Sequence, residues 1–250
     1  MTDIILCGCF GHMGRVISEI VSERDDCRIV AGIDTATGTA DFPVFTSPSL
    51  FKGKADVLID FSHPSALSGV LGYAVENSLP AVIATTGLDE RGKEELNKAS
   101  EKTAIFFSAN MSLGVNLLSA LSKAAAKVLG KSYDIEIVEM HHNRKIDAPS
   151  GTALLLADEI SSALDEKPEY EYNRHDRHVK RPKNEIGIHS VRGGTIVGEH
   201  QVIFAGTDEV ITLSHSAGSR KIFASGAVNA AIWLKGKAPG IYDMSSMIEG

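Results

Sequence analysis

The stretch DIILCGCFGHMGRVISEIV, residues 3 to 21, joins a short apolar run to three regularly spaced glycines and then to an amphipathic segment. The isoleucine-rich run from Asp3 to Gly8 predicts a strand that is buried on both faces. From Arg15 to Val21 the apolar residues recur on one helical face. The glycines therefore stand at a strand-to-helix turn, which is typical of the first unit of a doubly wound parallel sheet.

This turn also has the context of a dinucleotide-binding fingerprint, because glycines let a pyrophosphate approach the backbone and the helix start offers it free N–H groups. A second predicted strand, Arg28 to Ile33, ends in Asp34, 20 residues beyond Gly14. A carboxylate there can accept hydrogen bonds from both adenosine ribose hydroxyls. The glycines alone could merely shape a loop, but together with strand, helix and acid they favour cofactor binding. Thr35 supplies no cation for a 2′-phosphate and Asp34 would repel one, so we expect NADH to be preferred over NADPH.

Strand and helix patterns continue to alternate up to residue 108, which predicts a Rossmann-type α/β domain. In such sheets ligands lie beyond the carboxyl ends of the strands, although Thr and Ser at these positions could equally cap the next helix. The predicted strands are Ala55 to Phe61, Pro80 to Thr85 and Thr103 to Ser108, and the predicted helices are Pro64 to Asn77 and Asp89 to Glu101.

The pattern changes after Asn110. A predicted helix over Leu113 to Leu129 leads into segments in which apolar and polar residues alternate, which indicates a sheet with one wet face. We therefore expect a separate α+β domain with a mixed or antiparallel sheet, and we expect the apolar helix Arg220 to Leu234 to pack back on the first sheet. The alternating segments are Tyr133 to Met140, Glu185 to Val191, Thr195 to Ala205 and Glu209 to Ser216.

Composition narrows the function classes. The net charge of −7 disfavours nucleic acid and anionic membranes as partners. No apolar run approaches the roughly 18 residues of a membrane span and the N-terminus does not resemble a signal peptide, so we expect a cytoplasmic protein. The three cysteines, Cys7, Cys9 and Cys27, are an odd number and too few to hold a structural zinc, so we expect neither a disulfide framework nor a metal.

The basic segment from Arg174 to Lys183 is a local exception to the acidic composition. We predict a solvated, mobile loop there. A nucleic-acid patch is a weaker alternative, because aromatic residues do not interleave the charges. A third alternative is a positive field that steers an anionic substrate.

A second cluster of polar residues lies in EMHHNRKIDAPSGTALLLADEI, Glu139 to Ile160. His141 and His142 end a predicted strand, Lys145 follows in a loop, and Pro149 to Thr152 begin a helix. The helix start and the lysine favour a bound anion, and histidine can transfer a proton near neutral pH. Neighbours on a strand point to opposite faces, so one histidine could be structural, and a metal site is a third alternative.

The run from Glu139 to Ala153 resembles the signature of the 4-hydroxy-tetrahydrodipicolinate reductases, formerly called dihydrodipicolinate reductases, of bacterial lysine and diaminopimelate biosynthesis. The resemblance covers nearly the whole chain. It implies a reductase that uses NAD(P)H to convert 4-hydroxy-tetrahydrodipicolinate to tetrahydrodipicolinate with loss of water. It also implies a dinucleotide domain of residues 1–112 and 220–250, a substrate and oligomerisation domain of residues 113–219, hinges near Ser112 and Arg220, and a homotetramer.

The resemblance further implies roles for individual residues. His141 would be the acid/base residue and Lys145 the proton donor. His12 stands where the family commonly has arginine, and Ala84 where glycine is usual, so cofactor affinity and choice are the features affected. The implied substrate-binding residues are His142, Lys145, Ser150, Gly151 and Thr152; the implied cofactor-binding residues are Gly8, Cys9, Phe10, Gly11, His12, Met13, Asp34, Ala84, Thr85, Thr86, Ser108, Ala109, Asn110 and Met111.

Two other function classes fit parts of the sequence. A non-catalytic NADH sensor would keep the fingerprint but would need no proton donor. A related dehydrogenase of amino or imino acids would share both halves, but it should lack the run from His141 to Ala153. A pyridine-2,6-dicarboxylate competition assay would separate these enzymes.

Overall fold

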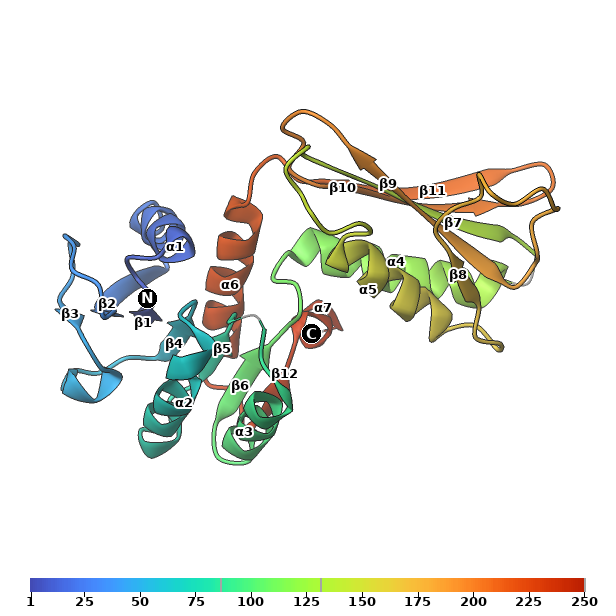
Figure 1. Cartoon of the computed structure of the whole chain (residues 1–250). Helices are drawn as coiled ribbons and strands as arrows, with labels where there is room; N and C mark the ends of the chain where they lie inside the picture. The colour runs from blue at the N-terminus through green and yellow to red at the C-terminus, as the bar shows by residue number, and fades with distance from the viewer. Residues whose placement is uncertain (86, 131, 250) are drawn as a thin grey trace. The chain divides into compact units, whose positions relative to one another are not determined.

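The structure is a computed structural model that describes residues 1–85, 87–130 and 132–249. It divides into two compact units: Met1–Ser112 together with the segment that begins at Lys221, and Leu113–Arg220. Over the described residues each unit contains one β-sheet, and Figure 1 labels the strands and helices of both.

The sheet of the first unit has seven strands within the described residues, and every strand pair is parallel. Their order is β12-β6-β5-β4-β1-β2-β3, so the chain runs outward from β1 in one direction and then crosses to β4 on the other side. This reversal is the place where open α/β sheets bind ligands. The strands are β1 (Thr2–Cys7), β2 (Cys27–Ile33), β3 (Val44–Phe45), β4 (Val57–Asp60), β5 (Ala81–Ile83), β6 (Ala104–Phe107) and β12 (Gly240–Tyr242).

Helices cover both faces of this sheet. Successive residues of a strand point to opposite faces, so one strand contributes side chains to two cores. Ile4 of β1 belongs to a core with α1 (His12–Ser22) and α6 (Lys221–Leu234). The adjacent Ile5 belongs to a second core with α2 (Leu67–Glu76) and α3 (Glu90–Ser100). The predicted doubly wound sheet and the packing of the last long helix against it are confirmed. The remaining helical segments are η1 (Pro48–Leu50), η2 (Pro64–Ala66) and α7 (Met244–Glu249).

The sheet of the second unit is mixed, with the order β11-β10-β7-β9-β8. β7 pairs with β9 in parallel and with β10 in antiparallel orientation. Inward-facing Ile135 and Ile137 pack with α4 (Leu113–Leu129) and α5 (Gly151–Ser161), which Figure 1 shows on the same side of the sheet. The strands are β7 (Asp134–His141), β8 (Glu169–Glu171), β9 (Glu185–Arg192), β10 (Glu199–Ala205) and β11 (Val210–Ser216).

Several predicted boundaries were wrong by a few residues. The strand expected from Thr195 begins only at Glu199, and the helix expected from Pro64 is a 3₁₀ turn followed by α2. The short strands β3, β8 and β12 were missed, because two or three residues are too few for a recognisable alternation. In the part of the chain that the structure describes, we find no helix with both the length and the apolar character needed to cross a membrane.

Residues 174–183 form a loop, as predicted, and seven of them are exposed, but its three arginines are only partly exposed. Their guanidinium groups form ion pairs with carboxylates of the same unit, so much of the positive charge of this segment is compensated locally. The pairs join Arg174 to Glu136 and Glu185, Arg177 to Glu171 and Glu185, and Arg181 to Asp134 and Glu136.

Candidate active site

The turn after β1 requires glycine at two positions. Gly8 has φ +77°, and a Cβ atom there would lie 2.6 Å from the carbonyl oxygen of Phe61. A Cβ atom at Gly14 would lie 2.1 Å from the carbonyl oxygen of Gly8. Gly11 is the N-cap of α1 and provides no side-chain cap for the first-turn N–H groups. The turn thus presents a tight backbone and an open helix start, which suit a pyrophosphate.

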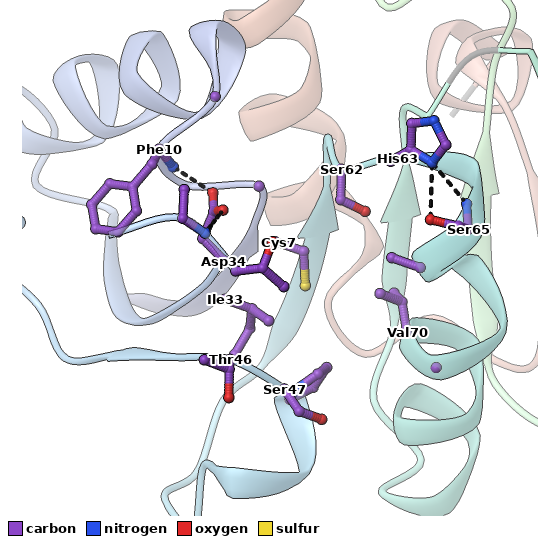
Figure 2. Close-up of a pocket in the computed structure, with 17 residues that line it drawn as sticks. Cys7, Phe10, Ile33, Asp34, Thr46, Ser47, Ser62, His63, Ser65 and Val70 are labelled. Carbon is purple, nitrogen blue, oxygen red and sulfur yellow. Dashed lines mark hydrogen bonds between the residues drawn. The ribbon is translucent and has the colours of Figure 1, made fainter. Parts of the chain in front are cut away.

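Asp34, just after β2, is fixed against this turn. Its carboxylate accepts a hydrogen bond of 2.9 Å from the backbone N–H of Phe10 (Figure 2) and another of 2.9 Å from the backbone N–H of Ala36. Both residues line a cavity of about 590 Å³, whose other walls include Ser47 and His63. The cavity is formed by residues at the carboxyl ends of β1, β2 and β4, where the strand order reverses. Its residues therefore fit the ribose and phosphates of a dinucleotide.

The loops after β4 and β5 meet on a buried carboxylate. Asp60 accepts hydrogen bonds from the Ser62 backbone and hydroxyl, at 3.1 and 2.5 Å, and from the Thr85 hydroxyl at 2.7 Å. Burial raises the pKa of Asp60, and the hydrogen bonds from Ser62 and Thr85 oppose this shift only in part. Asp60 lies near the end of the predicted strand Ala55 to Phe61, but it was not predicted as a site residue.

The other predicted cofactor residues differ in exposure. Cys9 and Met111 are buried in the core with α6, so only their backbones are available to a ligand. Ala84 is also buried, whereas Gly11, His12 and Ala109 are exposed. The Ser108 hydroxyl donates to the Asn110 carbonyl, and the Asn110 side chain accepts from the Ser112 N–H. Thr86 lies outside the described residues.

His141, the last residue of β7, is held by the carboxylate of Glu139. Its Nδ1 lies 2.6 Å from Oε2 of Glu139, and the side chain of Glu139 is fully buried. A carboxylate only accepts hydrogen bonds, so Nδ1 carries the proton and Nε2 is the other functional nitrogen. A Cβ atom at Gly198 would lie 3.1 Å from Nε2, so glycine avoids crowding this nitrogen.

Arg192 of β9 completes this cluster. Its two terminal nitrogens donate to both oxygens of Glu139, at 2.8 and 2.6 Å. Burial by itself would raise the pKa of Glu139, but hydrogen bonds from Arg192, Ser190 and His141 outweigh it and lower the pKa to about 2. Glu139 is therefore an anion at neutral pH. Neither Glu139 nor Arg192 was predicted as a site residue.

The second histidine, His142, differs from the first. Its Nε2 lies 3.5 Å from the guanidinium of Arg220. Its pKa is lowered, first by burial and then by nearby cations that include Arg144 and Arg220. Lys145 forms a 2.8 Å ion pair with Asp147 in the following loop. The structure thus brings three cations, Arg144, Arg220 and Lys145, near the imidazole of His142, the residue next to His141.

At the start of α5 the N-cap residue Ser150 is buried, whereas the next residue, Gly151, is exposed. Ser150 is 2% exposed; its hydroxyl accepts from the Ala153 N–H and lies 3.1 Å from Nε2 of His200. Gly151, by contrast, is exposed, and a Cβ there would meet no atom within 4 Å. Gly151 and Thr152 therefore begin the helix at an open place where an anion can approach the N–H groups.

His200, which sequence reasoning missed, stacks edge-on against His141 with 5.3 Å between the ring centroids. Burial, reinforced by His141, lowers the pKa of His200 to about 4, so this imidazole is neutral at pH 7. His200 lies on β10, about 60 residues along the chain from His141, and only the sheet pairing brings them together. In the described residues, no group of three or more His, Cys, Asp or Glu is arranged to hold a metal ion.

Comparison with known proteins gives consistent matches over both units. Residues 2–111 match the family described as dihydrodipicolinate reductase, N-terminus, and residues 114–248 match its C-terminus. The 4-hydroxy-tetrahydrodipicolinate reductase of Caldanaerobacter subterraneus subsp. tengcongensis is 51% identical, over 100% of this chain and 99% of the relative. The same-named protein of Clostridium tetani is 50% identical, over 99% and 97% respectively.

Solved structures extend this comparison. A dipicolinate-bound dihydrodipicolinate reductase from Paenisporosarcina sp. TG-14 superposes with a TM-score of 0.83 at 25% identity, covering 99% of both chains. The diaminopimelate dehydrogenase of C. glutamicum has a TM-score of 0.60 at 15% identity, over 97% of this chain and 92% of that one. At that identity the second similarity concerns the fold alone.

Proposed function

Because the chain belongs to the dihydrodipicolinate reductase family, we propose that it reduces 4-hydroxy-tetrahydrodipicolinate to tetrahydrodipicolinate, with loss of water and with NAD(P)H as the reductant. The protein is an oxidoreductase of lysine and diaminopimelate biosynthesis, and we place it in the cytoplasm, where NAD(P)H-dependent biosynthesis takes place. The observation that carries the proposal is the His141 imidazole, fixed by a buried carboxylate beside Lys145 and an open helix start.

The proposed chemistry needs a proton as well as a hydride. After the 4-hydroxyl of the substrate has left as water, the nicotinamide, when bound, would supply a hydride to C4 of the resulting conjugated cyclic imine. Electron density then moves through the conjugated C=C–C=N system to the ring nitrogen, which must be protonated. His141 acts as the acid/base residue and Lys145 as the proton donor, a contribution of about 10²–10⁴-fold for general acid catalysis.

We propose that the two substrate carboxylates bind around the start of α5. One lies at the backbone of Gly151 and Thr152, where Ser150 caps the helix beneath, and the helix dipole and N–H groups stabilise its charge. The other is bound by Lys145 and His142. Lys145 must then exchange its ion pair with Asp147 for the substrate, so substrate binding and positioning of the proton donor occur together.

We assign the cofactor to the first unit and the substrate to the second. The predicted cofactor residues of the glycine turn and of the loops after β5 and β6 support the first assignment. Each oxygen of Asp34 accepts one backbone hydrogen bond, which leaves a further lone pair on each for a ribose hydroxyl. Because its charge would repel a 2′-phosphate, we propose that NADH is preferred. Equal kcat/KM values for NADH and NADPH would reject this preference.

A homotetramer formed through the second unit is part of the proposal. The face of its sheet opposite α4 and α5 carries apolar side chains, and two of them, Val191 and Val210, are 44% and 61% exposed. A second copy of the chain would bury this face, whose apolar residues include Val138, Met140, Val191, Ile203 and Val210. Sedimentation equilibrium should give four chains per particle, and a monomer would reject the assembly.

The activity is tested with fresh condensation product of aspartate semialdehyde and pyruvate, followed by the loss of NADH absorbance. We expect turnover by the wild type, and a loss of about 10²–10⁴-fold in kcat for His141→Gln with unchanged NADH binding. Pyridine-2,6-dicarboxylate should compete with the substrate. NADH binding without turnover would instead favour a sensor, and turnover of an amino acid without such competition would favour a related dehydrogenase.

A further inference from the structure

The carboxylate of Glu139 is a buried junction of several hydrogen bonds. His141 and the two terminal nitrogens of Arg192 bind it from the sheet. The backbone N–H of Ser150, the N-cap of α5, donates to it at 3.1 Å. The acid/base residue and the helix start that we assign to the substrate are therefore fixed by one anion.

Arg192 extends this junction to the proposed proton donor. One of its terminal nitrogens donates to the carbonyl oxygen of Asp147 at 2.7 Å. Asp147 in turn holds Lys145 through its side chain. Arg192 is also the register partner of His141 across the parallel strands β7 and β9. The arginine therefore lies next to His141 and also contacts the loop that carries Lys145.

We propose that Glu139 and Arg192 are positioning residues of the reductase: Glu139 fixes the tautomer and ring orientation of His141, and Arg192 fixes Glu139 and the loop that carries Lys145. This inference rests on the proposed function. With Nδ1 engaged by Glu139, Nε2 accepts or donates the proton at the substrate, at the position that Gly198 leaves uncrowded.

A purely structural role explains these contacts less well. Buried ion pairs stabilise proteins little compared with apolar residues of similar size, so stability alone does not require charges here. A structural pair also does not need a short hydrogen bond to His141 or a contact with the loop of Lys145. Neutral His200, stacked on His141, adds no competing charge to the cluster.

The test replaces the carboxylate by an amide of equal size in Glu139→Gln. The variant is expected to lose about 10²-fold or more in kcat, because His141 no longer has one enforced tautomer, whereas KM for NADH stays within about twofold. The ring nitrogens of His141, observed by ¹⁵N NMR with the His141→Gln spectrum for assignment, should change from the Nδ1–H form to a mixture. Wild-type-like kcat together with an unchanged nitrogen spectrum would overturn the proposal.

Glu136→Gln is the matched control. Glu136 lies on the same strand but on the opposite face, where it also binds a histidine, His189 at 2.7 Å, and the arginines Arg174 and Arg181. The nitrogen signals of His141 are expected to stay unchanged in this variant. Equal changes in both variants would attribute the effect to a general loosening of the sheet and would overturn a positioning role.

Two further variants keep the test decisive if Glu139→Gln does not fold. Glu139→Asp restores a carboxylate and should recover part of the lost kcat and the Nδ1–H signal. Arg192→Lys keeps a positive charge but cannot bind both oxygens and Asp147, so a fall in kcat of about tenfold and a raised substrate KM are expected. A wild-type rate in Arg192→Lys would contradict the role of the arginine.

The NMR readout also separates this inference from the proposed function. If the wild type does not turn over the substrate, the proposed function fails, but the nitrogen spectra of the wild type and Glu139→Gln still report whether Glu139 fixes His141. If the wild type is active and the spectra do not differ, only the positioning inference fails.

Discussion

Asp60 and Glu139 are both fully buried carboxylates near the carboxyl end of a strand, one in each unit, yet their environments differ. Asp60 is bound by hydroxyl and backbone donors of Ser62 and Thr85, and its pKa is raised by burial. Glu139 is bound by a guanidinium among other donors, and its pKa is lowered to about 2. Burial favours the neutral acid in both, and the charge of the neighbours decides the outcome.

The two carboxylates therefore suit different tasks. Asp60 connects two loops that we assign to the cofactor, a task that hydrogen bonds perform whether the group is charged or not. Glu139 is bound to the imidazole of His141, which must carry a proton during reduction. A permanent anion at Glu139 stabilises the protonated imidazole. Four experiments test this contrast.

The largest effect is expected from Arg192→Met, which leaves Glu139 buried without its cation. Removing one partner of a buried ion pair costs about 3–5 kcal/mol of unfolding free energy. Urea unfolding at pH 7, with wild type and variant at the same protein concentration, measures this loss. The double variant Glu139→Met, Arg192→Met is the control and should recover a large part of the loss, because no unpaired charge remains. A loss below about 1 kcal/mol for the single variant would show that Glu139 is not held by Arg192.

The pH dependence of stability should have opposite signs at the two sites. The folded pKa of Glu139 is about 2 against an ordinary value of 4.5, so its contribution is complete above pH 4.5 and is lost as the pH falls towards 2. The folded pKa of Asp60 lies above its ordinary value of 3.8, so the folded state holds that proton more tightly and this site gains stability as the pH falls towards 3.8.

Unfolding free energies of wild type, Glu139→Gln and Asp60→Asn at several pH values measure these slopes. The gap between wild type and Glu139→Gln should narrow below pH 4.5, at up to about 1.4 kcal/mol per pH unit for one proton. The stability of the wild type relative to Asp60→Asn should instead rise as the pH falls. Parallel curves for all three proteins would reject the assigned charge states.

The sheet of the first unit and the surroundings of Glu139 differ in how well the sequence predicts them. The parallel sheet was predictable because the apolar runs of its strands and the glycine turn at Gly8 to Gly14 are local patterns. The N-cap Ser150 and the helix after it were predictable for the same reason. The family followed from the run Glu139 to Ala153, and the comparisons confirm it.

The environment of His141 was not predictable. Arg192 reaches Glu139 only because β7 and β9 pair in parallel with His141 opposite Arg192, and alternation in a sequence does not specify a partner strand or its register. His200 is likewise placed near His141 only because β10 pairs with β7, with His200 opposite Glu139. The ion pairs of the basic segment were not predicted for a related reason, because two of the four carboxylate partners of its arginines, Glu136 and Asp134, lie about 40 residues earlier in the chain.

An intermediate case sharpens the comparison. Glu136 resembles Glu139 in its partners, a histidine and arginines, but within one chain its side chain is 20% exposed, whereas that of Glu139 is fully buried. Under conditions in which a second copy does not cover this face, Glu136→Gln is therefore expected to lose only about 1 kcal/mol or less, and the loss should shrink with added salt because partly exposed pairs are screened. Urea unfolding at low and high salt measures it. A salt-independent loss as large as that of Arg192→Met would mean that exposure does not separate the two glutamates.

The smallest effect is expected from Asp60→Asn, although Asp60 is as deeply buried as Glu139. The amide oxygen can accept from the Ser62 N–H and hydroxyl as before, and the amide nitrogen can donate to the Thr85 hydroxyl, whose proton rotates away. No cation is left unpaired and the buried charge disappears, so stability at pH 7 should change by less than about 0.5 kcal/mol or increase. Asp60→Ala, which removes the acceptors of both loops, is the matched control and should be clearly destabilised. A loss of several kcal/mol in Asp60→Asn would show that the site needs the negative charge itself, and the contrast with Glu139 would fail.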